Sequence, residues 1–378
     1  MPELTAAVLS ASGECPLTKA PRPAQHGAMT SSHPSRFLLA WLLPLAVLTA
    51  ALNSAWAAWL TTLLFQLCLA MAERFPGLRH SPPAASHDTA WHRVALHGHV
   101  VLQAGLLATC LAMMATRGWH WPEAIVLGIA VGGVTGGQGI TMAHELGHSR
   151  SRLSRLCAWL LMSSVNYSHF MVEHYRGHHV RAATHADPAT ARNGESLWRF
   201  LPRTLLGSFF SAWALEAQQL RRHGRTWMRS PLLWSLLAQL AWLAVLFQWL
   251  GFAALLFWCV QSMYAVFLLE AINYIEHYGL VRQASRGKSE AFGVHHAWNA
   301  DHFLTNCFLV NLQRHSDHHM HAWKPFATLQ ALPGPQLPTG YAGCMFLALI
   351  PRLWFGVMHR RLAAHAASHA APHVATSS

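Results

Sequence analysis

The chain has 378 residues, of which 53% are hydrophobic and only 11% are Asp, Glu, Lys or Arg. Soluble domains carry charged residues at about a quarter of their positions. The composition therefore excludes an ordinary soluble enzyme and indicates a membrane protein surrounded by lipid. The formal net charge is +12. The positions of the basic residues indicate the membrane topology, as described below. No nucleic-acid partner is expected.

Six apolar stretches are each close to the roughly 20 residues that a helix needs to cross a bilayer. They lie at 37 to 53, 55 to 72, 94 to 115, 122 to 143, 231 to 250 and 252 to 274. The first two divide at Asn53 and Ser54, and the last two divide at Gly251. We therefore expect an all-α integral membrane bundle of six spans, arranged as three helical hairpins.

Basic residues favour the cytoplasmic ends of membrane spans. If the N-terminus is cytoplasmic, every Lys and Arg except Arg117 falls on the cytoplasmic side. The long segments 144 to 230 and 275 to 361 would then form a histidine-rich cytoplasmic cap over the bundle. Such a cationic face could hold an acidic partner.

The two ends of the chain differ in composition from the rest. Residues 1 to 36 are rich in Pro, Ser and Ala and lack the apolar core of a cleavable signal. We expect a disordered cytoplasmic arm at 1 to 36, a single membrane domain at 37 to 361, and a disordered tail at 362 to 378. The seven cysteines include no C-x-x-C pair, which predicts reduced packing residues and no cysteine-ligated iron centre.

The fourth span is rich in glycine. Its glycines are Gly128, Gly132, Gly133, Gly136, Gly137 and Gly139. Glycines in a span either let neighbouring helices approach closely or leave room for a bound molecule. Both interpretations stay open at this point.

Nine histidines fall into four clusters on the polar flanks of the spans. They are His144 and His148 in HELGH, His174, His178 and His179 in EHYRGHH, His277 in NYIEHYG, and His315, His318 and His319 in QRHSDHH. Neutral imidazole binds iron, zinc, copper and nickel, and residues three or four apart share one face of a helix. Each multi-histidine cluster is thus expected to present its rings to a common point. Because one metal accepts four to six ligands, nine histidines predict two metals.

An acidic residue stands beside a histidine in every cluster. The candidates are Glu145, Glu173, Glu276 and Asp317, and Asp187 is a fifth. An acid that accepts the far ring N–H of a ligating histidine fixes its tautomer and raises its basicity. Nine further histidines, namely His169, His185, His295, His296, His302, His321, His365, His369 and His373, are expected to be ordinary polar residues.

HELGH also matches the H-E-x-x-H pattern of zinc proteases, in which the glutamate activates water. A membrane zinc metalloprotease would leave the other three clusters without a purpose, so it is a remote alternative. A metal transporter would need polar ligands within the spans, which contain few.

The motifs HELGH, EHYRGHH, NYIEHYGL and LQRHSDHH, in this order, resemble those of the membrane alkane monooxygenases, the alkane omega-hydroxylase family that includes xylene monooxygenase. The resemblance covers about Thr141 to Arg361 and includes HADPATARNGES at 185 to 196 and LPTGY at 337 to 341. It implies that all nine histidines, His277 included, bind two non-haem irons, with neither haem nor flavin.

The resemblance further implies hydroxylation of the terminal methyl of medium-chain n-alkanes to 1-alkanols, with O2 as co-substrate. Electrons would come from rubredoxin and its NADH-dependent reductase, and the apolar hydrocarbon would enter from the lipid. The implied location is the bacterial inner membrane, with both termini and the active site cytoplasmic. Hydroxylation of aromatic methyl groups and fatty-acid desaturation are the alternatives.

Overall fold

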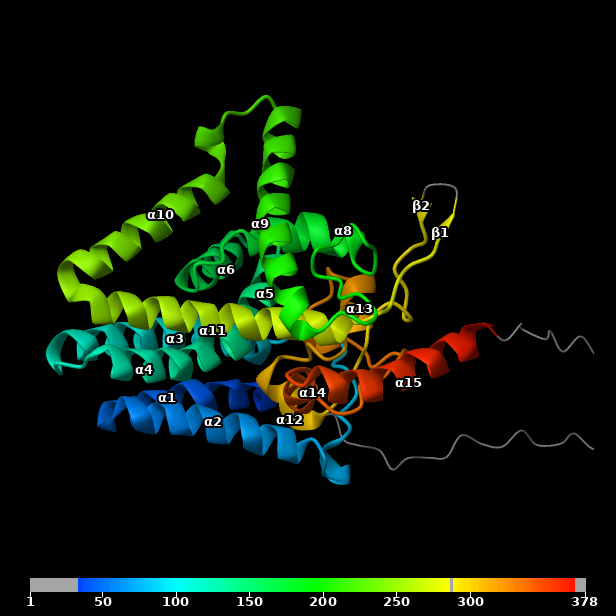
Figure 1. Ribbon diagram of the computed structural model, residues 1–378, viewed down its shortest axis with the longest axis horizontal. Helices are drawn as coiled ribbons and strands as arrows, with labels where there is room; N and C mark the ends of the chain where they lie inside the picture. The colour runs from blue at the N-terminus through cyan, green and yellow to red at the C-terminus, as the bar shows by residue number, and fades with distance from the viewer. Residues whose placement is uncertain (1–32, 286–287, 371–378) are drawn as a thin grey trace, which may run out of the picture.

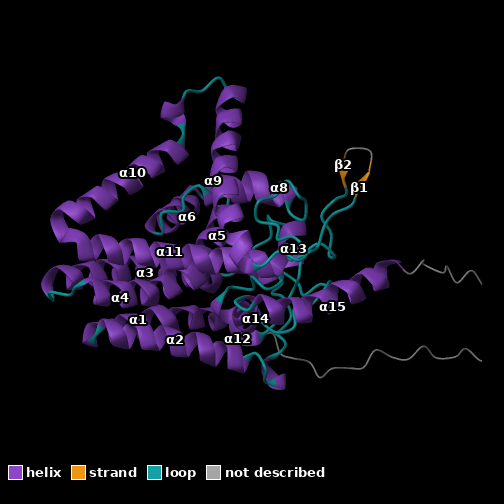
Figure 2. Ribbon diagram, viewed as in Figure 1, coloured by secondary structure: helices purple, strands orange, loops and turns teal. Residues whose placement is uncertain are grey.

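The structure is a computed structural model that describes residues 33–285 and 288–370. Almost all of its regular structure is helical, as expected (Figure 2). Within the described residues the strands form one small antiparallel hairpin, in which Ala284 pairs with Ser289 and Ser285 with Lys288. Residues 1–32 and 371–378, which hold most of the predicted arm and part of the predicted tail, lie outside the described residues.

The N-terminal half of the chain contains the first four expected spans and the first two histidine motifs. Its elements are η1 (Pro34–Trp41), α1 (Leu42–Asn53), α2 (Ala55–Ala72), η2 (Pro76–Leu78), α3 (Ala90–Thr116), α4 (Trp121–Val134), η3 (Thr135–Gly139), α5 (Ile140–His148), α6 (Arg152–Ser164), α7 (Phe170–Glu173), η4 (His174–His178) and α8 (His179–Arg181). Here η3 and η4 are π-helical turns, whereas η1 and η2 are 3₁₀ helices.

The C-terminal half contains the remaining spans and motifs. Its elements are α9 (Leu197–Arg222), η5 (Trp227–Arg229), α10 (Pro231–Val245), η6 (Leu246–Leu250), α11 (Gly251–His277), β1 (Ala284–Ser285), β2 (Lys288–Ser289), α12 (Phe303–Phe308), α13 (His315–Met320), η7 (Phe326–Thr328), α14 (Tyr341–Ala348) and α15 (Pro351–Ala370).

Five helical stretches in the described residues are long and apolar enough to cross a membrane, where the sequence predicted six. They are Pro34–Asn53, Ala55–Ala72, Ala90–Thr116, Trp121–His148 and Pro231–His277. The counts differ because the last two expected spans are continuous in helix over 47 residues. Gly251 has φ 80°, which favours glycine, and the chain turns there between α10 and α11 (Figure 1).

Helix α11 lies at the centre of the bundle and packs most closely on α4, which in turn contacts α2. Figure 1 shows α1 to α4 and α11 running side by side, with α9 crossing their direction. Helix α6 of the first insertion contacts α5, and α9 of the first insertion and α14 of the second contact α11. His144 and His148 lie on α5, and His277 ends α11. The end of the bundle that carries the histidine motifs is therefore polar, and the rest of the bundle is mainly apolar.

Helix α15 corrects the predicted boundary of the disordered tail. The sequence placed that boundary at residue 362, but α15 continues to Ala370. The buried side chains of Trp354 and Met358 attach α15 to the cluster that also contains Tyr274 and Tyr278 of the α11 end. The half-buried Leu362 continues this contact at the start of the segment that was expected to be disordered.

The glycines of the fourth span serve both of the roles considered above. A Cβ built on Gly136 would lie 2.5 Å from Ala265 Cα of α11, and one on Gly132 would lie 2.7 Å from the Gln261 carbonyl oxygen. These glycines let α11 approach closely. A Cβ on Gly137 meets nothing within 4 Å, and Gly137 lines an apolar cavity.

We expect Gly136→Ala to destabilise the fold, because the added methyl must displace the α11 backbone. Overpacking of this kind typically costs about 1–3 kcal/mol, which a thermal melt of the detergent-solubilised protein would detect. The neighbouring Gly137→Ala is the matched control and should melt close to wild type. Equal melting temperatures for all three proteins would contradict the close approach at Gly136.

Candidate metal centre

The nine predicted histidines lie on elements that meet at the polar end of the bundle. His144 and His148 are one turn apart on α5, and His277 is the last residue of α11. The EHYRGHH histidines occupy η4 and the start of α8, and the QRHSDHH histidines lie on the six-residue helix α13. All nine are buried or largely buried.

The structure brings the nine histidines together in two adjacent groups. Within each group, one possible ligand atom from each residue lies within 4.8 Å of all the others. The five-histidine group is His144, His148, His174, His179 and His318, and the four-histidine group is His178, His277, His315 and His319. The two groups adjoin, since the rings of His179 and His319 have centroids 4.6 Å apart.

The expectation that each cluster presents its rings to one point is wrong for two of the three clusters. His178 joins the four-histidine group, whereas its neighbours His174 and His179 join the other. The cause is the π-helical turn η4, whose wider turn brings residues five apart onto one face in place of residues four apart. The α13 cluster also divides. His318 belongs to the five-histidine group, whereas His315 and His319 belong to the four-histidine group.

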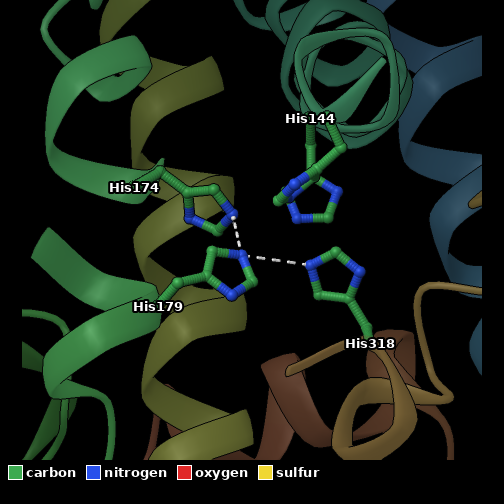
Figure 3. Close-up of side chains that lie close together, drawn as sticks. His144, His174, His179 and His318 are labelled. Atoms are coloured by element: carbon green, nitrogen blue, oxygen red, sulfur yellow. Dashed lines mark hydrogen bonds between the residues drawn. The ribbon is translucent and has the colours of Figure 1, made fainter. Parts of the chain in front are cut away.

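Ring nitrogens in each group approach at distances suited to a shared ion. His174 Nε2 lies 3.0 Å from His179 Nε2, which lies 3.3 Å from His318 Nε2, as Figure 3 shows beside His144. In the other group, His277 Nε2 and His315 Nε2 are 3.0 Å apart. When two nitrogens each lie about 2.1 Å from one ion and the N–ion–N angle is 90°, the nitrogens are about 3.0 Å apart. The observed distances are therefore close to those expected for ligands of one ion.

The Nε2 atoms satisfy a second requirement for a metal site, because none is used by another residue. The Nε2 atoms of His144, His148, His178 and His319 have no hydrogen-bond partner, and those of the other five contact only an Nε2 of the same group. Buried polar atoms are normally paired. Within the described residues, these nine atoms are therefore available to bind ions.

The protonation of the rings suits metal binding too. Burial lowers the pKa of five histidines well below the ordinary value, and the neighbouring imidazoles add to the shift; these are His174, His179, His315, His318 and His319. They are neutral at pH 7 and can donate a lone pair. His178 differs, because the Asp187 carboxylate outweighs burial and raises the pKa of His178.

Three of the five candidate acids contact a histidine of the groups. Asp187 Oδ2 lies 2.8 Å from His178 Nδ1, and Glu276 Oε1 lies 3.1 Å from His315 Nδ1. Glu145 Oε1 is 3.3 Å from the Nδ1 atom of its neighbour His144. The Asp187 contact is a hydrogen bond and directs the Nε2 side of the His178 ring inward, which is the orientation that metal-ligating histidines adopt. The Glu276 and Glu145 contacts are close approaches without hydrogen-bond alignment.

The other two candidate acids face cationic side chains. Glu173 Oε1 accepts a hydrogen bond of 2.5 Å from the Arg181 guanidinium. Asp317 accepts hydrogen bonds from the Lys324 ammonium group and the Gln330 backbone N–H, and it pairs with His321 Nδ1. Their contacts tie α7 and α13 to neighbouring segments.

None of the histidines expected to be ordinary polar residues belongs to either group, in so far as the structure describes them. His321 pairs with Asp317, and His296 Nε2 lies 3.1 Å from Glu290. His169 is buried against Tyr167 and Phe209.

Sequence reasoning missed Glu270, a fully buried carboxyl group on α11. It accepts hydrogen bonds from Tyr167 Oη at 2.9 Å, Thr204 Oγ1 at 2.8 Å and Asn273 Nδ2 at 3.2 Å. Glu270 also lines a small cavity with His174 and His178. The available signal was an acid inside an otherwise apolar span, which usually marks a functional site.

Arg314 was also missed, because it reads as an ordinary basic residue of QRHSDHH. Its buried guanidinium donates to Asp301 Oδ1 at 2.9 Å and to the carbonyl oxygens of Leu329 and Pro82, each at 2.7 Å. Arg314 immediately precedes α13. These hydrogen bonds therefore fix the start of the helix that carries three of the nine histidines.

An apolar cavity of about 120 Å³ adjoins the site inside the bundle. Its lining includes Phe65, Phe267 and Phe308, together with Gly137 and Ile272. A second, smaller cavity reaches the histidines themselves. It is lined by His144, His174 and His315 along with apolar residues that include Ile272, so this isoleucine lies between the apolar cavity and the metal groups.

Comparison with known proteins places these features in a family. The family model described as fatty acid desaturase matches residues 119–348. Alkane 1-monooxygenase 2 of Pseudomonas aeruginosa is 40% identical over 73% of this chain and 74% of its own length. Alkane 1-monooxygenase 1 of the same organism is 42% identical over 67% of each chain.

The hydroxylase component XylM of the xylene/toluene monooxygenase from Pseudomonas putida is also similar, at 32% identity over 58% of this chain and 59% of its own. The range matched by the family model includes all four histidine motifs. The chain therefore belongs to the alkane 1-monooxygenase family, within the broader group that the fatty acid desaturase family model describes.

Proposed function

We propose that this chain is a membrane alkane hydroxylase that converts the terminal methyl group of a medium-chain n-alkane to a 1-alkanol. The observation that carries the proposal is the convergence of nine Nε2 atoms, used by no other residue, next to an apolar cavity. The names of the similar alkane 1-monooxygenases support the same reaction.

Two non-haem irons are the proposed cofactors, with no haem and no flavin. His144, His148, His174, His179 and His318 would hold one ion, and His178, His277, His315 and His319 the other. When bound, the irons would supply the redox chemistry that activates O2, so that one oxygen atom enters a C–H bond and the other leaves as water. Imidazole ligands suit iron, and an oxygen-using reaction favours it over zinc.

The residues of the chain perform the remaining tasks. Asp187 holds the ring of His178 in the orientation that points Nε2 inward, and Glu276 lies close enough to His315 Nδ1 to favour the same orientation there. Glu145 is proposed to do the same for His144. Glu173 and Asp317 contact no ligating ring and instead stabilise α7 and α13 through Arg181 and Lys324. The aromatic lining of the cavity would bind the hydrocarbon and exclude water.

The membrane arrangement follows from the basic residues. We propose six spans, with α10 and α11 crossing separately on either side of the turn at Gly251. Both termini and the metal centre would lie on the cytoplasmic side of a bacterial inner membrane. The membrane domain would then run from η1 into α15, and an arginine-rich cap would receive rubredoxin, itself reduced by an NADH-dependent reductase.

The metal content tests the proposed ligands. The purified chain should contain about two irons, one for each histidine group. His315→Ala and His318→Ala each open a gap in a different group, so each should lose iron and essentially all activity. The exposed His223 belongs to neither group, and His223→Ala should retain both irons. One tightly held zinc without iron would favour the zinc protease instead.

Product analysis tests the reaction. Cells that express the chain with a rubredoxin and its reductase should convert octane mainly to 1-octanol, with the hydroxyl oxygen derived from labelled O2. Much faster hydroxylation of xylene would keep the mechanism but change the substrate to an aromatic methyl group. Saturated acyl chains that gain a double bond, with no alcohol formed, would establish a desaturase.

Cysteine labelling tests the orientation. A membrane-impermeant thiol reagent applied to intact spheroplasts should label Ser54→Cys and Gly251→Cys, in the proposed outer turns, and should not label Arg192→Cys between the fourth and fifth spans. Labelling of all three after lysis is the positive control. Labelling of Arg192→Cys in intact spheroplasts would place the metal centre outside and exclude a cytoplasmic electron donor.

A further inference from the structure

Glu276 contacts two side chains through the same oxygen atom. Its Oε1 lies 3.1 Å from His315 Nδ1 and accepts a short hydrogen bond from Tyr341 Oη. All three residues are buried. A line of contacts therefore runs from Tyr341, the first residue of α14, through Glu276 to a histidine of the four-histidine group.

The Glu276 carboxylate favours one tautomer of the His315 imidazole. Glu276 Oε1 and His315 Nδ1 lie 3.1 Å apart, although the two atoms are not aligned as a hydrogen bond. A carboxylate this close favours the tautomer with the proton on Nδ1, which leaves the lone pair on Nε2, 3.0 Å from His277 Nε2. A carboxylate alone can rotate about its last bonds, because that torsion is broad. The hydroxyl of Tyr341 holds the carboxylate, since it occupies the oxygen that faces His315.

Tyr341 is itself held by a buried acid from a distant part of the chain. Glu73, just after α2, accepts hydrogen bonds from the backbone N–H groups of Ala342 and Gly343, at 3.3 and 3.0 Å. It also accepts one from Thr305 Oγ1 at 2.7 Å. A carboxylate at a helix N-terminus satisfies N–H groups that lack helical partners, so Glu73 fixes the start of α14 and with it Tyr341.

The geometry points to Tyr341 as a positioning residue for the metal centre, acting through Glu276 on His315. The inference rests on the proposed two-metal function and deepens it. It gives a role to LPTGY, the segment at 337 to 341 that ends with this tyrosine. Tyr341 touches neither metal group directly, so its effect should appear in how well the four-histidine group binds its ion.

A merely structural tyrosine is available for comparison. Tyr274 is fully buried in the same hydrophobic cluster as Tyr341, and its hydroxyl donates to the Glu195 carbonyl oxygen at 2.7 Å. Tyr274→Phe and Tyr341→Phe each remove one hydroxyl from this cluster. The two variants should therefore lose similar stability, whereas only Tyr341→Phe releases Glu276.

The test is an anaerobic titration of the metal-free full chain with ferrous ion, against a competing chelator. Loss of an acid that supports a ligating histidine typically weakens metal binding 10–100-fold. Glu276→Gln should thus weaken one of the two sites by about that factor, and Tyr341→Phe should weaken the same site by about tenfold. Tyr274→Phe should bind both ions as wild type does, with a melting temperature close to that of Tyr341→Phe.

The double variant shows whether Tyr341 acts through Glu276. Residues that act in series are not additive, so Tyr341→Phe with Glu276→Gln should bind iron no more weakly than Glu276→Gln alone. Wild-type affinity in Tyr341→Phe, or losses that multiply in the double variant, would overturn the inference and leave the two-metal function intact. If Tyr341→Phe fails to fold, unchanged affinity in the isosteric Glu276→Gln overturns it. A wild-type chain that binds no ferrous ion overturns the proposed function itself.

Discussion

The burial of nine imidazoles in one place is the constraint on which the rest of the structure depends. A buried polar atom without a partner costs about 1–3 kcal/mol, and here no Nε2 of the nine has a partner outside the groups. One ion bound in each group would satisfy these atoms. The buried guanidinium of Arg314, the capping carboxylate of Glu73 and the Asp187 and Glu276 contacts lie around the two groups, at helix starts or beside the rings.

Departures from regular α-helix make the convergence possible. The π-helical turn η3 lies directly before the α5 histidines, and η4 contains His174 and His178. A π turn changes the direction of the residues that follow it, and such turns are frequent at functional sites. In η4 the change separates His178 from His174, so that one short motif supplies ligands to both groups. Gly136, within η3, allows the α11 backbone to approach at Ala265, and α11 ends at His277.

Much of this arrangement follows from the sequence. The parts that the sequence does not predict have identifiable physical causes. Apolar length predicts the spans. The spacing of the motifs, together with the family resemblance for His277, selects the nine histidines that the fold brings together. The division into groups of five and four depends on the π turn at His174–His178, which helical spacing rules do not foresee. Contacts such as Tyr341 with Glu276 join residues 65 positions apart, so only the fold reveals them. The sequence divides the last two expected spans at Gly251. It did not predict that the helical stretch continues through the turn at this residue.

The acids around the site also account for the charge that two ions would bring. Four buried carboxyl groups lie at or beside the histidines and form no ion pair with Lys or Arg in the part of the chain that the structure describes; they are Glu145, Asp187, Glu270 and Glu276. Two divalent ions held by neutral imidazoles carry four positive charges into surroundings of low dielectric constant, where an uncompensated charge is costly. Each of these carboxyl groups that ionises beside a bound ion would offset one positive charge. Glu173 and Asp317 cannot contribute to this balance, because Arg181 and Lys324 already neutralise them. Ion binding at the histidines would therefore favour the ionised form of the neighbouring carboxyl groups, which burial alone disfavours.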